Sequence, residues 1–222
     1  MHGGRLWRIV ALTGLAAGSC GGPGSTVRPD ETSVEGHRQE ADRERTAAAE
    51  ARLHDQPSTR VISPSVPGMP WDPTSGTHDP AEDHRYESRW HAEHARDHEA
   101  AAQALEQFEA NECHGIAPSE RAACPLLGPV ASILDLPRGV RVQLASTVSV
   151  ERTLARLRCH YAFARARGFG PTVASCPLFM RGIDIKAAAD GRAIEILGSS
   201  RQQARELQRR TRQQAVFAKP SS

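Results

Sequence analysis

The chain has 222 residues, of which 39% are apolar and 5% aromatic, a composition that leaves room for one compact domain and a polar segment without a core of its own. The formal net charge is +2, but the charge is divided: Cys20–His114 carries 19 acidic and 9 basic side chains, whereas Gly115–Ser222 carries 7 acidic and 17 basic ones. Because so few aromatic side chains accompany the arginines, nucleic acid is a poor candidate for a partner.

The N-terminal segment has the features of an export signal. Arg5 and Arg8 provide the positive charge that precedes the short apolar run Ile9–Ala17, and small residues stand directly before Cys20. The segment resembles the signal peptide of bacterial lipoproteins, whose lipobox ends in a cysteine that becomes the fatty-acylated N-terminus. This resemblance implies that residues 1–19 are removed and that Cys20 anchors the protein in the inner or outer membrane of the cell envelope, with its domain on the periplasmic or extracellular side.

Two alternatives to lipidation are open. The small residues before Cys20 also fit an ordinary secretory cleavage site, which would export the chain without a lipid. An uncleaved membrane anchor is less favoured, because the apolar run is much shorter than the roughly 20 residues of a membrane-spanning helix.

Residues 20–78 are predicted to form a disordered tether. The segment is rich in Gly, Pro, Ser, Thr and charged residues and has no sustained apolar period. It therefore cannot bury enough surface to offset the entropy lost on ordering. Within it, Arg38–His54 contains an alanine-rich run that favours a transient helix, and the prolines that follow keep the chain extended.

A long helix is predicted from Asp79 to about Glu112. Asp79 provides an N-cap, Pro80 a first helical residue, and Glu82 follows three residues after the cap. The helix places four histidines on one stripe, where neighbouring imidazoles could share a Zn²⁺, Cu²⁺ or Ni²⁺ ion. These are His84, His91, His94 and His98. The alternative is that the histidines are solvated, since helical pairs without a third ligand bind metal weakly.

The other four cysteines occur in two similar settings, which indicates an internal duplication. Cys113-His114 is followed by Cys124-Pro125-Leu126, and Cys159-His160 is followed by Cys176-Pro177-Leu178. After each setting a glycine turn, a short strand and a helix are predicted in the same order. The strands are Val140–Leu144 and Ala193–Leu197, and the helices are Val150–Arg165 and Arg201–Phe217.

The predicted order is helix, hairpin, helix, hairpin, helix. It gives an α+β fold over residues 79–218, with a small antiparallel sheet covered on one face by the helices. Because export leads to an oxidising compartment, the four cysteines are expected to form two disulfides. Local pairing of Cys113 with Cys124 and of Cys159 with Cys176 is favoured over the crossed pairings, since each bridge would join a helix end to the entry of the next strand.

Two other roles for these cysteines are less favoured. The two Cys-His steps and the two further cysteines could supply a Cys/His metal site, but the spacings of 11 and 17 residues lack the close Cys-x-x-Cys pairs of structural zinc sites. A thioredoxin-like redox role is less favoured still, because the sequence has no Cys-x-x-Cys that would lower a thiol pKa.

The sequence favours a membrane-anchored exported lipoprotein with a disulfide-stabilised, non-catalytic binding domain, because no serine, carboxylate or cysteine constellation has catalytic spacing. The alternative function is periplasmic metal binding or sensing through the histidine stripe, with Zn²⁺ or Cu²⁺ as the ion. The basic C-terminal half suits an anionic envelope component or an envelope protein as partner. It also suits packing beside the acidic helix of the same chain.

Overall fold

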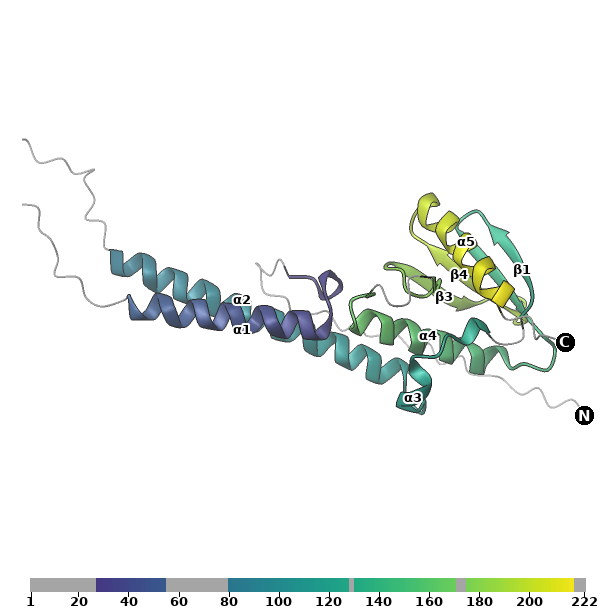
Figure 1. Cartoon of the computed structure of the whole chain (residues 1–222), viewed down its shortest axis with the longest axis horizontal. Coiled ribbons are helices and arrows are strands. Elements are labelled where there is room, and N and C mark those ends of the chain that lie inside the picture. The colour runs from purple at the N-terminus through teal and green to yellow at the C-terminus, as the bar shows by residue number, and fades with distance from the viewer. Residues whose placement is uncertain (1–26, 55–79, 128–129, 171–174, 218–222) are drawn as a thin grey trace, which may run out of the picture.

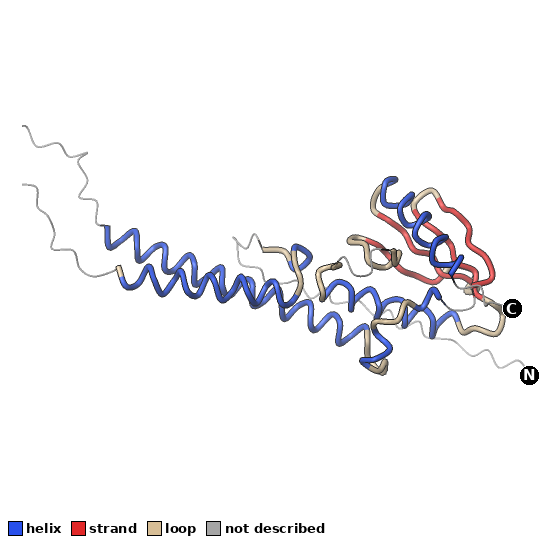
Figure 2. Tube along the Cα trace, in the orientation of Figure 1, coloured by secondary structure: helices blue, strands red, loops and turns tan. Residues whose placement is uncertain are grey.

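The computed structural model describes residues 27–54, 80–127, 130–170 and 175–217, and its class is α+β, as predicted (Figure 1). Four strands form one antiparallel sheet, and two long helices extend away from the sheet as an arm (Figure 2). With 3-10 helices written as η, the elements are η1 Pro29–Glu31, α1 Val34–Leu53, α2 Pro80–Glu112, α3 Pro118–Arg121, η2 Pro125–Leu127, β1 Val130–Leu136, β2 Gly139–Leu144, α4 Val150–Ala166, β3 Ile183–Ala187, β4 Ala193–Gly198 and α5 Arg201–Phe217.

The predicted signal peptide and Cys20 lie outside the described residues. Among the helices that the structure does describe, none combines the length and the apolar character needed to cross a membrane.

Helix α1 lies inside the segment predicted to be a disordered tether, and that prediction is wrong over this range. The Ser33 side chain caps the helix by accepting a hydrogen bond from the Gly36 amide at 2.9 Å. The helix then runs antiparallel along α2, so that His37 lies opposite His98 while Glu44 lies opposite His91. The packing against α2, which sequence periodicity in α1 alone does not reveal, orders the segment.

The seam between α1 and α2 follows the alternating spacing of three and four residues that is typical of coiled coils. On α1 it consists of His37, Ala41, Glu44, Ala48 and Ala51, and on α2 of Ala81, His84, Ser88, His91, Ala95, His98, Ala102 and Leu105. All six of these alanines are buried. Small side chains allow the two helices to approach closely, so the arm is held by matched surfaces that contain few large apolar residues.

The sheet has the strand order β1-β2-β4-β3, with every neighbouring pair antiparallel. Side chains alternate between its faces: Val142 pairs with Ile194 on the buried face, and Arg141 pairs with Glu195 on the other, where the two form an ion pair at 2.7 Å. The buried strand residues form one hydrophobic core with Leu157 of α4 and Leu207 of α5.

Helices α4 and α5 cover the buried face of the sheet. Helix α4, capped by Ser149, contacts β3 and β4, while α5 contacts β1, β2 and β4. Both helices contact the short η2 helix. The segment that leads into η2 and the loop before β3 therefore meet between the two helices, directly over the sheet.

The acidic helix α2 packs against part of the basic half of the chain. This is one of the two explanations that the sequence offered for the divided charge. Glu109 near the end of α2 pairs with Arg121 at 3.1 Å and with Arg167 at 3.3 Å. Asp30 of η1 pairs with Arg165 of α4 at 2.5 Å. These ion pairs lie where the arm joins the sheet domain.

Candidate metal centre

The structure does not bring the predicted histidine stripe together around one point. His91 and His98 both lie in the seam of the arm, but they are seven residues apart, which separates them by about 10 Å along the helix axis. Each has its own partner on α1: Glu44 lies 2.5 Å from His91, and His37 lies 3.1 Å from His98. The stripe is thus part of a helix-helix interface.

The other two histidines of the stripe also have separate surroundings. His94 leaves the seam and contacts Trp90, with ring centroids 3.9 Å apart and the ring planes tilted by 34°. His84 contacts Glu87 of its own helix at 3.4 Å. Among the described residues, one group of three potential metal ligands has donor atoms within 4.8 Å of one another, and it includes none of these histidines.

One disulfide joins Cys113 to Cys159, with the Cα atoms 4.5 Å apart. The predicted local pairing, Cys113 with Cys124 and Cys159 with Cys176, is therefore wrong. The end of α2 lies beside the middle of α4, so the first cysteine of one setting meets the first cysteine of the other. The bridge links the arm covalently to the sheet domain.

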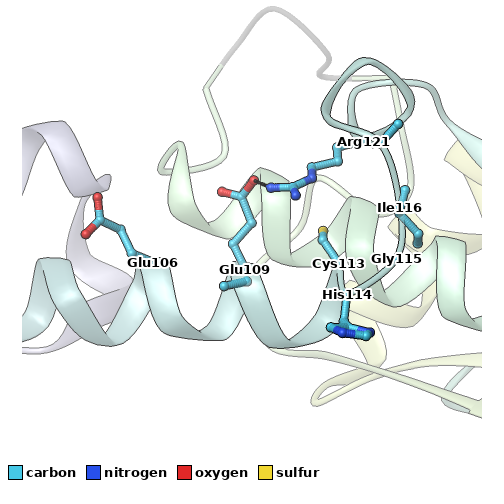
Figure 3. Close-up of a pocket in the computed structure, with 9 residues that line it drawn as sticks. Glu106, Glu109, Cys113, His114, Gly115, Ile116 and Arg121 are labelled. Atoms are coloured by element: carbon cyan, nitrogen blue, oxygen red, sulfur yellow. Dashed lines mark hydrogen bonds and ion pairs between the residues drawn. The ribbon is translucent and has the colours of Figure 1, made fainter.

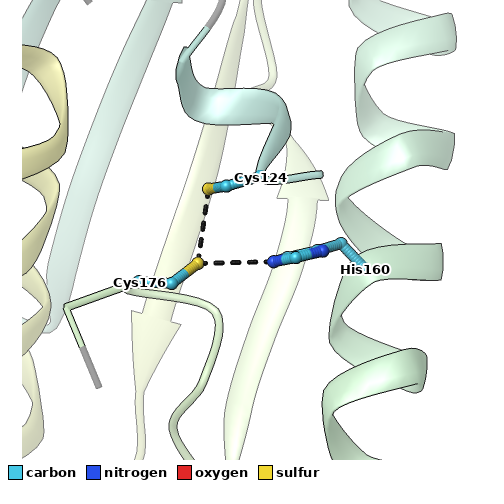
Figure 4. Close-up of side chains that lie close together, drawn as sticks. All are labelled: Cys124, His160 and Cys176. Carbon is cyan, nitrogen blue, oxygen red and sulfur yellow. Dashed lines mark hydrogen bonds between the residues drawn. The ribbon is translucent and has the colours of Figure 1, made fainter. Parts of the chain in front are cut away.

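The second cysteine of each setting also meets its counterpart. Cys124 and Cys176 have free thiols whose sulfur atoms lie 3.3 Å apart. Nε2 of His160 lies 3.5 Å from the Cys176 sulfur. Figure 4 shows the three side chains converging between α4 and α5, with Cys124 directly before η2, His160 on α4 and Cys176 in the loop before β3. This is the group of three potential ligands.

A hydrogen bond fixes the orientation of His160. Its Nδ1 atom lies 2.7 Å from the Arg121 carbonyl oxygen, which can only accept, so Nδ1 carries the proton. The Nε2 atom of the neutral ring therefore presents its lone pair to the thiols. Metal-ligating histidines are usually held in this way, with the second ring nitrogen donating to a carbonyl or carboxylate. The ring is only 1% exposed, so its orientation is also fixed by packing.

The two thiols have unequal proton affinities because they share one hydrogen bond. The hydrogen bond from Cys176, together with a smaller contribution from a backbone hydrogen bond at Leu126, lowers the pKa of Cys124 to about 5, although burial opposes the shift. The same contact with Cys124, and then burial, raises the pKa of Cys176. At neutral pH the pair is therefore one thiolate and one thiol, which is the charge state that a thiophilic cation would meet first.

The cluster is open to solvent on the Cys124 side. A cleft of about 360 Å³ is lined by Cys124, Glu120 and Arg156, and also by Cys159 of the disulfide. Cys124 is partly exposed, whereas Cys176 is fully buried. Of the three residues of the cluster, Cys124 is therefore the one that lines this cleft.

A larger cleft of about 750 Å³ lies at the joint between the arm and the sheet domain (Figure 3). Its charged side chains have ion-pair partners, because Arg121 reaches across to Glu109 and Glu106 pairs with Arg38 of α1, and Cys113 belongs to the disulfide. His114 points away from this ion pair. The cleft contains no free nucleophile and is better explained as the structural joint.

No protein-family model, curated protein or solved structure matches this chain. The Cys124–His160–Cys176 cluster and the sequence are therefore the features of the chain that indicate a function. Sequence reasoning had these residues among the potential Cys/His ligands but rejected the site on spacing. The repeated Cys-His step was the available signal, and it did not show that only His160 would face the thiols.

Proposed function

We propose that this protein is an exported lipoprotein of the bacterial cell envelope, anchored through Cys20, whose α+β domain binds a thiophilic metal ion at Cys124, His160 and Cys176. The metal part of the proposal rests on one observation: a histidine held by a carbonyl presents its free nitrogen to two thiols 3.3 Å apart. Export is supported by the disulfide between Cys113 and Cys159, because such bonds persist in oxidising compartments.

Zn²⁺ is the ion that the donor set favours. Two thiols and an imidazole are ligands typical of zinc, and Cu⁺ is the main competitor for the same donors. Tetrahedral coordination by zinc places two sulfur ligands roughly 3.8 Å apart and a sulfur and a nitrogen roughly 3.6 Å apart. Two of the three observed separations, 3.3 Å and 3.5 Å, are close to these values, and all three donor atoms lie within 4.8 Å of one another.

This proposal moves metal binding from the histidine stripe to the cysteine cluster. The stripe residues His91 and His98 already have partners on α1. The cluster has three donor atoms from three parts of the chain and an opening to solvent. With three protein ligands and one accessible side, the site suits binding, transfer or sensing of an ion.

The test is a titration of the mature protein with Zn²⁺ after mild reduction that leaves the Cys113–Cys159 bridge intact. We expect saturable binding of one ion per chain, and Co²⁺ in its place should give thiolate-to-metal absorption. His160→Ala removes a ligand, so it should weaken binding by more than the roughly 10- to 100-fold that loss of an outer-shell partner costs.

The matched control is His114→Ala, because His114 is the exposed histidine of the first Cys-His step. It should bind like the parent, and so should a variant with alanine at His91, His94 and His98. Absence of saturable binding by the parent, or unchanged binding by His160→Ala, would contradict the metal proposal.

The anchor is tested separately by labelling cells with a fatty acid. The parent should incorporate the label and fractionate with membranes, whereas Cys20→Ser should lose both properties. Cys124→Ser is the control, since it removes a cysteine that lies in the folded domain. Label that persists in Cys20→Ser would show that acylation occurs elsewhere.

We also propose that the two cysteine settings arose by internal duplication. The burial patterns of the two central strands support this, because Gly139–Leu144 and Ala193–Gly198 alternate between buried and half-buried residues in the same order. With Gly139 equivalent to Ala193, one residue away from the correspondence predicted from the sequence, Arg141 is equivalent to its own cross-strand partner Glu195, and a two-fold axis through that pair exchanges the two strands. A two-fold relation of this kind brings equivalent cysteines together, which explains both Cys113–Cys159 and Cys124–Cys176.

The partner of the domain is proposed on charge. The C-terminal half keeps an excess of arginine, and the ion pairs with Glu109 and Asp30 engage only part of it. An anionic envelope component or an acidic surface of an envelope protein is the partner class that this surface favours.

A further inference from the structure

The two free cysteines differ in access in a way that metal binding alone does not require. Cys124 lines the cleft of about 360 Å³, whereas Cys176 has no exposed surface and lies behind it. Their sulfur atoms are 3.3 Å apart, and His160 Nε2 lies 3.5 Å from the buried one. An accessible sulfur, a buried second sulfur and an adjacent base are the parts needed for thiol-disulfide exchange.

We infer that Cys124 and Cys176 form a redox-active pair that exchanges with small or protein disulfides, with Cys124 as the attacking and Cys176 as the resolving residue. The pair is independent of any Cys-x-x-Cys motif, because the fold and not the local sequence brings the sulfurs together. The same reaction would control whether the metal site is occupied. That consequence rests on the proposed function, whereas the exchange reaction itself does not.

The reaction needs an external disulfide, R–S–S–R, as the oxidant. The Cys124 thiolate attacks one sulfur, which forms a mixed disulfide with Cys124 and releases the other half as a thiolate. The Cys176 thiol then attacks the Cys124 sulfur and gives its proton to His160 Nε2, and the second half of the oxidant leaves as a thiolate. The two cysteines lose two electrons and become a disulfide, and the oxidant gains both electrons and leaves as two thiolates, which take up protons from His160 and from water.

The new disulfide and the metal exclude each other. Both sulfur atoms are used in the Cys124–Cys176 bond, so an ion held there would keep only His160 as a ligand. Oxidation should therefore release the ion, and reduction should restore the site. The existing disulfide offers one competing route, because Cys159 lines the same cleft and could itself be attacked.

The experiment treats the mature protein, with two free thiols and the Cys113–Cys159 bridge intact, with oxidised glutathione in the presence of a chelator. The parent should form a Cys124–Cys176 disulfide and release two molecules of glutathione per chain. Cys176→Ser should stop at the mixed disulfide, with one glutathione mapped to Cys124 by mass spectrometry. Cys124→Ser should react about tenfold more slowly or not at all, because Cys176 is reached only after local opening.

Equal rates for Cys124→Ser and the parent would overturn the inference, and so would failure of Cys176→Ser to form an adduct. A parent product in which Cys159 has changed partner would assign the attack to the existing disulfide and would also overturn it. In a second arm without chelator, the Zn²⁺-loaded parent should release one ion as the disulfide forms. Lack of bound Zn²⁺ in that arm would contradict only the proposed metal site, because the exchange is measured without metal.

Discussion

His37 and His98 place two imidazoles in contact inside the arm. His37 is fully buried, and its Nε2 donates to the Pro29 carbonyl at 3.2 Å, so its Nδ1 accepts from His98 at 3.1 Å. Burial is the largest cause that lowers the pKa of His98 from its ordinary value, and protonation of the adjacent His37 would lower it further, although Glu40 and Glu44 act in the opposite direction. The arm therefore favours the neutral form of His98.

This pKa shift predicts a loss of stability in acid. An unfolded histidine titrates near pH 6.5, and in the folded arm the pKa of His98 is lower. Its contribution is therefore fully present above about pH 6.5 and is lost as the pH falls through the folded-state pKa. The urea midpoint of the parent should fall between pH 7.5 and pH 5.5 by more than that of His98→Gln. Exposed His114→Gln serves as the control and should follow the parent; equal pH dependence of His98→Gln and the parent would contradict the assignment.

The arm shows at the level of helices how small side chains order a polar segment. Ala48 of α1 is 4% exposed in the seam, whereas Ala49, the next residue, is exposed. Ala48→Gln should lower the free energy of unfolding by about 1–3 kcal/mol, because a longer side chain forces the helices apart. Ala49→Gln makes the same change in helix propensity, but it should change the free energy of unfolding by less than about 0.5 kcal/mol. Urea unfolding followed by circular dichroism measures both, and equal effects would show that the seam is not formed in solution.

The disulfide between the arm and the sheet domain acts on the molecule as a whole. It joins residues 46 apart in sequence, and closing a loop of that length stabilises a protein by about 4 kcal/mol in the chain-entropy description. Replacement of both Cys113 and Cys159 by serine should lower the free energy of unfolding by about 2–4 kcal/mol. Non-reducing urea unfolding measures the effect. Zn²⁺ binding by the folded variant should persist, since Cys124, His160 and Cys176 are unchanged; its loss would show that the bridge positions the site.

Much of the sheet domain is predictable because its signals are local. Residues that are close in the sequence predict its elements. The helix start at Pro80 and the alternating residues of Val140–Leu144 are examples. Helix α5 has the predicted bounds, and α4 ends one residue beyond its prediction. Helix α1 was missed as a stable element because alanine signals burial only when a second helix with matching small residues lies against it.

The sequence by itself determined the α+β class and the kinds of donor atoms available, since both follow from residue type and local period. It also carries the main argument for export, which rests on the segment that ends at Cys20, and the Cys113–Cys159 disulfide adds support. Only the tertiary structure decided which cysteines meet and that His160, rather than the helical stripe, faces them. The physical reason is that sulfur and imidazole chemistry depends on separations of 3–4 Å, and contacts between residues tens of positions apart are set by how whole elements pack.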